Sequence, residues 1–219
     1  MTRAAASRPR GGLADKRRAI LTGALTVFAR DGYTRASIDA ISTQAGVSTR
    51  TVYNHFTDKT ELFLTVIQES ATRAAEAQIA IIQRHLRKVT DVEADLIEFG
   101  REWLTPMPEL ASHFAMVRQI RAEAEHIPPE AMETWQETGP RRVRRELAGH
   151  LRAMAERGLL RIDDPERAAL HLMLLISARL TDDDRVEPSE QEITETVTTG
   201  VRAFLHGHLP RPAGSGTGG

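Results

Sequence analysis

The chain has 219 residues, of which 41% are hydrophobic, and its formal net charge is −1. This length allows one large domain or two small ones, each with a buried core. The absence of cysteine excludes disulfides, thiolate nucleophiles and cysteine-based zinc sites. No stretch approaches the roughly 20 consecutive apolar residues of a membrane span, and no apolar run follows the N-terminal arginines as in a signal peptide, so we expect a cytoplasmic protein without membrane contact.

Charge is distributed unevenly along the chain. Residues 1–74 contain 11 Lys and Arg against 6 Asp and Glu, a net charge of +5, and the remainder contains 18 against 24, a net charge of −6. A basic N-terminal part would be attracted to phosphates, and an acidic remainder would be held away from a duplex. Sums of this size also arise by chance, so the asymmetry only supports what the motifs indicate.

The first 13 residues are rich in Arg, Ala, Gly and Pro and have no periodicity, which predicts a disordered basic arm. Arg3, Arg8 and Arg10 could add phosphate contacts or enter a minor groove, although a solvated tail is the simpler interpretation. A first helix is predicted over residues 15–30, where apolar residues recur at helical spacing, and Asp31-Gly32 would close it.

Residues 37–56 have the pattern of two short helices joined by a tight turn. Ser37 can cap a helix that carries its apolar residues at helical spacing, and Gly46 follows the last of them as a left-handed stop. Ser48 can then cap a second helix, whose inward residues would be Val52 and Phe56. Such a pair is a helix-turn-helix, in which the second helix enters the major groove of DNA.

The outer face of the second helix carries the side chains that DNA recognition requires. Arg50 can form two hydrogen bonds to a guanine edge, and Thr49 or Thr51 can contact a base. Tyr53 and His55 are better placed for phosphates. Lys59 would lie at the N-terminus of the next helix, where phosphate is favoured. The predicted DNA-binding residues are Ser37, Ser48, Thr49, Arg50, Thr51, Tyr53, Asn54, His55 and Lys59.

A long helix without Pro or Gly is predicted from residue 58 to about 88, with a length of roughly 45 Å. It would act as a lever between the helix-turn-helix and the rest of the chain. Further helices are predicted over 91–104, 109–126, 130–138, 140–157, 166–180 and 189–206, followed by a disordered tail over 209–219. The arginines at 141, 142, 144 and 145 could bind an anion, but pairing with nearby carboxylates is the simpler interpretation.

These residues resemble the N-terminal domain of TetR/AcrR-type transcriptional repressors. The resemblance covers about residues 14–74 and depends on the following segments: Phe28-Ala29-Arg30-Asp31-Gly32-Tyr33, Ala45-Gly46-Val47-Ser48, Thr51-Val52-Tyr53-Asn54-His55-Phe56, Lys59 and Leu62. The chain departs from the family pattern at Ser42, where alanine is usual, and at Arg50, where glycine is common. Residues 114–180 also look like the AefR-type C-terminal domain of one branch of the family.

The resemblance implies an all-α fold. An N-terminal three-helix domain (14–74) would be joined by the long helix to a ligand-binding and dimerisation domain (75–208). It also implies a repressor that leaves a palindromic operator when an unidentified small molecule binds the C-terminal domain. The helices 166–180 and 189–206 would form the homodimer interface, although they could instead only complete the core of a monomer.

Candidates for the ligand pocket are large or polar residues set into apolar helix faces, and for each of them a place in the core is the stronger interpretation. They are Trp103, Phe114, Val117, Arg121, Trp135, Met154 and His171.

Two other classes of function compete with DNA binding as interpretations of the sequence. A di-iron carboxylate enzyme needs two Glu-x-x-His motifs, and the chain has one, Glu123-x-x-His126. A helical adaptor that binds only protein would have no use for the constellation from Arg50 to Lys59. The sequence has no P-loop, dinucleotide or metalloprotease motif, so we expect neither an enzyme nor a cofactor or metal.

Overall fold

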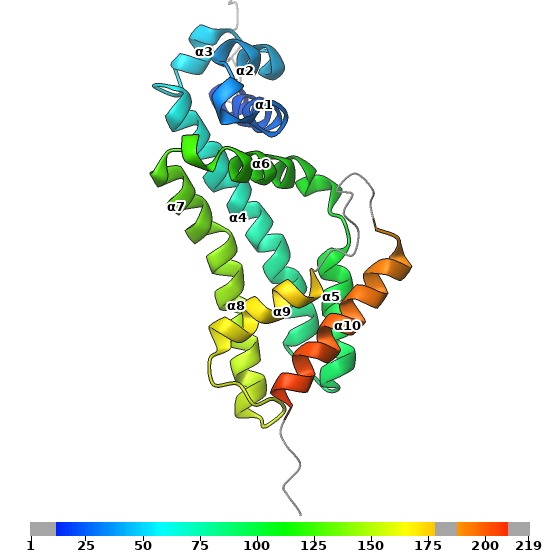
Figure 1. Cartoon of the computed structure of the whole chain (residues 1–219). Coiled ribbons are helices and arrows are strands. Elements are labelled where there is room, and N and C mark those ends of the chain that lie inside the picture. Colours follow the sequence, from blue (N-terminus) through cyan, green and yellow to red (C-terminus); the bar gives the residue numbers. More distant parts are fainter. Residues whose placement is uncertain (1–11, 178–187, 210–219) are drawn as a thin grey trace, which may run out of the picture. The chain divides into compact units, whose positions relative to one another are not determined.

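The computed structural model describes residues 12–177 and 188–209, and every regular element in these ranges is helical (Figure 1). The elements are α1 (Gly12–Arg35), α2 (Ile38–Ala45), α3 (Thr49–Tyr53), α4 (Lys59–Leu86), α5 (Val92–Leu104), η1 (Pro108–Leu110), α6 (Ala111–Ala122), η2 (Ala124–His126), α7 (Pro129–Thr138), α8 (Pro140–Glu156), α9 (Pro165–Ile176) and α10 (Glu190–His208). The predicted all-α fold is confirmed. Most of the predicted arm, residues 178–187 with the end of the helix predicted over 166–180, and most of the predicted tail lie outside the described residues.

None of the helices in the described part of the chain combines the length and the apolar character needed to cross a membrane.

The helices divide into two compact units. The first contains the described residues up to Ala74 together with Met107–Thr138, and the second contains Ala75–Pro106 together with the described residues from Gly139 onward. The sequence predicts a C-terminal domain over residues 75–208, and this division stays a prediction. Within the first unit, α6 lies along α1 (Figure 1).

The first unit is held together by one hydrophobic core. Phe28 of α1 and Phe63 of α4 meet edge to face, with ring centroids 4.9 Å apart, and Tyr33 lies 4.7 Å from Phe63. Ile120 of α6 and Trp135 of α7 are buried in the same cluster. Burial of each such side chain contributes about 1.5–3 kcal/mol, so α6 and α7 are integral to the domain that carries α2 and α3.

The helix α1 is interrupted at Gly32, close to its predicted end. Gly32 has φ 78° and ψ 175°, a conformation that is not helical and that residues with a Cβ rarely adopt. The chain then turns through residues 33–36 into α2. We call these four residues the α1–α2 connection.

The helix α4 is continuous over 28 residues, as predicted, which corresponds to about 42 Å. Its residues up to Ala74 belong to the first unit and those from Ala75 to the second. Whether α4 acts as a lever stays a prediction.

The second unit brings α5 and α9 against α10 and α8 against α9. Two glycines allow close approach. A Cβ at Gly100 of α5 would lie 2.5 Å from a methyl carbon of Val197, and one at Gly200 of α10 would lie 2.5 Å from the carbonyl oxygen of Leu175. The N-terminus of α10 is fixed by a capping box in which Ser189 and Glu192 satisfy each other's backbone amides.

The helix α9 was expected to be buried on more than one side. Within the described chain it buries one face, which includes Leu172 and Ile176. Leu170, Leu174 and Leu175 are 41%, 62% and 36% exposed. The sequence showed that the helix is apolar around most of its surface, but a single chain covers only part of that surface.

Candidate functional site

The turn between α2 and α3 has the geometry that its sequence predicts. Ser37 caps α2 by accepting a hydrogen bond from the backbone N–H of Ala40 at 3.1 Å. Gly46 adopts the left-handed conformation with φ 65°, and the N–H groups of Gly46 and Val47 donate to carbonyl oxygens of the last turn of α2. This arrangement satisfies the free carbonyls of the helix end and directs the chain into α3.

The helix α3 is anchored by its inward residues. Ser48 caps it by accepting from the N–H of Thr51 at 3.2 Å. Val52 and Phe56 are buried, as predicted, in the same core as Phe28. The opposite face of this short helix is therefore directed away from the core.

Four of the predicted DNA-contacting residues, Thr49, Arg50, Thr51 and Tyr53, belong to α3, and Asn54 and His55 follow it directly. Arg50, Tyr53 and Asn54 are exposed, and Thr49, Thr51 and His55 are half-buried. The hydroxyl oxygens of Thr51 and Ser48 lie 2.9 Å apart and hydrogen-bond to each other. Arg50 forms no ion pair with any residue in the ranges 12–177 and 188–209, so its guanidinium is free to bind an external acceptor.

Lys59 has partners other than the predicted phosphate. Its ammonium donates to the carbonyl oxygens of Tyr33, Thr34 and Ala36 at 2.9, 3.3 and 3.1 Å, and it lies 4.7 Å from the centre of the Tyr33 ring. All three of its N–H donors are thereby used within the first unit. Lys59 thus holds the α1–α2 connection, and a phosphate contact would require it to release these carbonyls.

The N-terminus of α4 is also occupied by carboxylates. Asp58 accepts from the N–H of Glu61 at 2.8 Å, and Glu61 in turn accepts from the N–H and the hydroxyl of Thr57. The hydrogen bonds from the Thr57 backbone and then from its hydroxyl lower the pKa of the Glu61 carboxyl below its ordinary value. These carboxylates occupy the helix N-terminus where a phosphate was expected.

Two contributors to the first unit were not identified from the sequence. Glu123, at the end of α6, binds Thr34, which is 89 residues away. Arg17 of α1 pairs with Glu69 of α4 at 3.0 Å and lies 5.5 Å from the centre of the Phe56 ring. Both are contacts between distant segments, for which local periodicity gives no signal.

The seven candidates for the ligand pocket are divided between the two units, and which of them line a pocket stays a prediction. Phe114, Val117, Arg121 and Trp135 belong to the first unit, and Trp103, Met154 and His171 belong to the second. Trp135 is buried in the core of the helix-turn-helix, with Val117 packed against it.

The remaining candidates are placed as follows: Met154 is buried, Trp103 and Phe114 are half-buried, and Arg121 and His171 are exposed. Periodicity identified which positions are apolar, but it could not show which helix would cover them.

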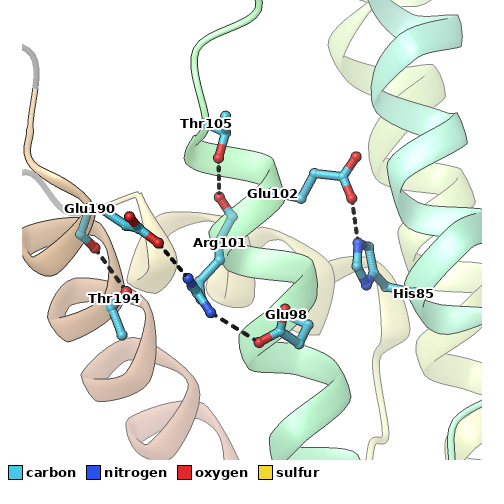
Figure 2. Close-up of polar contacts among 7 residues, drawn as sticks. All are labelled: His85, Glu98, Arg101, Glu102, Thr105, Glu190 and Thr194. Carbon is cyan, nitrogen blue, oxygen red and sulfur yellow. Dashed lines mark hydrogen bonds and ion pairs between the residues drawn. The ribbon is translucent and has the colours of Figure 1, made fainter.

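The second unit contains a cleft of about 500 Å³ between α4, α5 and α10, and none of those seven residues lines it. Its lining residues are His85, Glu98, Arg101, Glu102, Thr105, Pro106, Glu190 and Ile193. Figure 2 shows how the charged groups pair across it.

Ion pairs connect the walls of this cleft. Arg101 of α5 binds Glu98 at 3.2 Å and Glu190 of α10 at 3.0 Å, and His85 of α4 binds Glu102 at 2.5 Å (Figure 2). Partial burial would raise the pKa of the Glu102 carboxyl, but hydrogen bonds from His85 and Arg84 outweigh it, so the pKa lies below its ordinary value.

The other residues singled out in the sequence have structural partners. Arg144 of the arginine cluster pairs with Glu166 at 3.2 Å. Glu123 of the Glu-x-x-His motif binds Thr34, and His126 is exposed. Within residues 12–177 and 188–209, no group of three or more His, Asp or Glu side chains could hold a metal ion.

The chain matches two family models. Residues 20–66 match the bacterial regulatory proteins of the tetR family, and residues 94–207, more than half of the chain, match the AefR-like transcriptional repressor C-terminal domain.

Individual proteins are similar over different extents. The chain is 31% identical over 167 residues to the transcriptional repressor AcnR of Corynebacterium efficiens, which covers 73% of this chain and 76% of AcnR. It is 36% identical over 77 residues to the transcriptional activator FasR of Mycolicibacterium smegmatis, a match that spans only 33% of FasR and 35% of this chain. A solved structure of a TetR-family regulator from Mesorhizobium loti superposes with a TM-score of 0.77 at 28% identity, covering 93% of this chain and all of that one.

The two family matches together reach from α1 to α10, and the helix-turn-helix geometry of α2 and α3 agrees with the first of them. The family is not enzymatic, and the Glu-x-x-His motif has a structural explanation in the contact of Glu123 with Thr34. The chain belongs to the TetR family of DNA-binding transcriptional regulators and carries an AefR-like C-terminal domain.

Proposed function

We propose that this protein is a homodimeric repressor that binds a palindromic operator and leaves it when a small molecule binds the C-terminal domain. The observation that carries the DNA-binding part is the free Arg50 guanidinium on the exposed face of a capped, core-anchored α3. A rigid helix that presents an unpaired arginine can place two N–H donors against a guanine edge.

The proposed dimer interface lies on α9 and α10. Leu170, Leu174 and Leu175 expose apolar surface on α9, and apolar surface gathered on one helix is typical of an interface. An isologous pair would present two copies of α3 to DNA. Half-sites about 34–36 Å apart, or a multiple of that distance, are then expected in an inverted repeat.

Repression rather than activation is supported by the longer of the two similarities. AcnR, named as a repressor, aligns over 73% of this chain, whereas the activator FasR aligns over 35% of it. A dimer seated on a promoter blocks the polymerase sterically. Transcription in vitro from a promoter that carries the selected site should therefore fall as the protein is added.

Release by an effector requires that the ligand binds more tightly to a conformation with lower DNA affinity. The cleft between α4, α5 and α10 is a place to search for such a ligand, because its walls come from three helices joined by ion pairs that a ligand could exchange. The helix α4 would carry the change, since it is continuous from this unit into the first.

The experiment that tests the DNA-binding proposal selects sites from a random duplex library with the full-length protein at near-physiological salt. Enrichment of an inverted repeat supports a sequence-specific dimer. Failure of folded, dimeric protein to enrich any site contradicts the proposal.

The selected site then tests Arg50 directly. Arg50→Ala should weaken binding by about 5-fold to 150-fold and relax the preference at one base pair of each half-site. Arg73→Ala is the matched control, because Arg73 is exposed on α4 of the same unit and its loss removes the same charge. Equal affinity and equal sequence preference for the two variants would show that Arg50 does not read a base.

A further inference from the structure

The carboxylate of Glu123 lies against the α1–α2 connection. Its Oε2 accepts a hydrogen bond from the backbone N–H of Thr34 at 3.0 Å and another from the Thr34 hydroxyl, also at 3.0 Å. A carboxylate that receives two donors from one residue fixes both the backbone and the side chain of that residue. Thr34 is therefore attached to the end of α6 as well as to its own neighbours in the chain.

Gly32 creates the space for this carboxylate. A Cβ at position 32 would lie 2.0 Å from Oε1 of Glu123, and the φ of 78° at Gly32 is unfavourable for other residues. Glycine is thus favoured here for two reasons: the backbone conformation, and the carboxylate that a Cβ would force to move away. The sequence alone indicated only the first.

Glu123 is itself held firmly by its neighbours. It is the C-cap of α6, where its N–H donates to the carbonyl of Gln119 at 2.9 Å, and its own carbonyl accepts from the N–H of His126 at 2.8 Å. Ile120 and Ile127, on either side of it, are buried in the core of the first unit. The packing of α6 therefore fixes the backbone from which this side chain extends, and the two hydrogen bonds to Thr34 hold its carboxylate.

The α1–α2 connection is held from its other side by Lys59, which takes the carbonyl oxygens of Tyr33, Thr34 and Ala36. The Glu123 carboxylate binds the N–H and hydroxyl of Thr34, and the Lys59 ammonium binds these carbonyls. Together the two groups fix the orientation of the α1–α2 connection. The cap of α2, Ser37, follows it directly, and α3 packs on α2. The direction of the recognition helix α3 thus depends on how these residues are held.

We infer that Glu123 is a positioning residue for DNA binding: by holding Thr34, it couples the segment Met107–Thr138 to the orientation of α3. This inference rests on the proposed function. Glu123 lies at the end of α6, within the residues that match the AefR-like domain, and it would influence operator affinity through Thr34 without touching DNA.

The sign of the effect separates this role from simple electrostatics. Removal of the Glu123 carboxylate makes the first unit more positive, which by itself would strengthen binding to DNA. Loss of positioning lowers the fraction of molecules whose α3 is correctly oriented, and apparent affinity falls by the same factor. A merely stabilising contact would lower the unfolding midpoint but leave the affinity of the folded protein unchanged.

The test uses the full-length variants Glu123→Ala, Glu123→Gln and Thr34→Val, with Glu125→Ala as the control. Glu125 is exposed two residues further along, and its carboxylate has no hydrogen bond to any of the described residues, so its loss changes the charge equally. Affinity for the selected operator is measured by fluorescence anisotropy at a temperature where every variant is folded. We expect Glu123→Ala to weaken binding by about threefold to tenfold relative to Glu125→Ala, and Thr34→Val to have little further effect in that background.

Backbone hydrogen exchange gives a second measurement that needs no operator. Glu123→Ala should accelerate exchange at Thr34 and in α2 and α3, whereas Glu125→Ala should not. If Glu123→Ala and Glu125→Ala bind the operator equally and exchange equally in α2 and α3, the inference is overturned. If the wild-type protein selects no operator, the proposed function fails, and hydrogen exchange alone then decides whether Glu123 positions α3.

Discussion

Replacement of Lys59 by Met should destabilise the first unit. Methionine retains an unbranched side chain of similar length but cannot donate hydrogen bonds. The carbonyl oxygens of Tyr33, Thr34 and Ala36 would lose their shared partner, and the Tyr33 ring would lose the cation beside it. The helix would still begin at the same place, because Asp58 and Glu61 continue to cap it.

The magnitude follows from the exposure of these contacts. A hydrogen bond to a charged group contributes about 1.5–3 kcal/mol. The bond to Thr34 is exposed and those to Tyr33 and Ala36 are part-buried, so water replaces much of what is lost. With a cation–π contribution of about 0.5–1 kcal/mol, we expect a net loss of roughly 2 to 3 kcal/mol. For a chain of this size, that corresponds to a fall in Tm of roughly 4 to 12 °C.

Urea unfolding, followed by circular dichroism, measures this loss, and Lys88→Met is the control because Lys88 is exposed just beyond α4. The salt dependence of operator binding is measured for the same variants. A phosphate contact by Lys59 predicts instead a slope of log K against log[salt] that is smaller by about 0.9. An unchanged free energy of unfolding together with that smaller slope would refute this structural role of Lys59.

Three further predictions concern packing, pH and assembly. Gly200→Ala should destabilise the protein by about 1–3 kcal/mol in urea unfolding, because the new Cβ meets a backbone carbonyl of α9. At Gly207 a Cβ meets nothing, so Gly207→Ala should stabilise α10 by about 0.5–1 kcal/mol, and equal effects of the two substitutions would contradict the close approach. Burial, and secondarily a nearby arginine, lower the pKa of His113 from 6.5 to about 4. The neutral imidazole therefore allows the full free energy of unfolding above pH 6.5, and about 3 kcal/mol of it is lost as the pH falls towards 4. His113→Gln should remove this pH dependence, and parallel pH profiles of variant and wild type would argue against it. Leu174→Glu should shift the protein to a monomer in sedimentation velocity while Leu13→Glu should not, and a dimer that persists would place the interface elsewhere.

The helix-turn-helix could be predicted from the sequence because the signals that build it are local. Ser37 and Ser48 bond to amides three residues further on, and Gly46 bonds within the last turn of α2. Val52 and Phe56 differ by one helical turn. Each signal lies inside a window of a few residues, so a sequence pattern can represent it fully.

The partners of Lys59 and Glu123 could not be predicted in the same way. Lys59 binds residues 23 to 26 positions earlier, and Glu123 binds one 89 positions earlier. A helix N-terminus beside a lysine suggested a phosphate site, because local sequence shows the amides but not the carbonyls that fold back onto the side chain. The Asp31-Gly32 pair indicated a helix end without showing that a carboxylate would use the space.

Tertiary packing also determines which of the apolar residues are buried. Trp135 was a candidate for a ligand pocket, and the structure buries it in the core of the first unit. Leu174 belongs to a helix that is apolar around most of its surface, yet it is exposed within one chain. Sequence periodicity shows which helix faces are apolar. Which element covers each face depends on the topology of the fold and, for α9, on the proposed second subunit.

The division of the chain suggests where any signal from the second unit arrives. The chain passes between the two units after Ala74, after Pro106 and after Thr138. One of these crossings lies within α4, which begins at Lys59, and the other two bound the segment that carries Glu123. Lys59 and Glu123 both hold the α1–α2 connection, one through its carbonyls and the other through Thr34. A displacement carried by α4 or by the segment of Glu123 would therefore alter the hydrogen bonds of the same four residues. We expect hydrogen exchange at residues 33–36 to respond to the proposed effector whichever of the two segments transmits its binding.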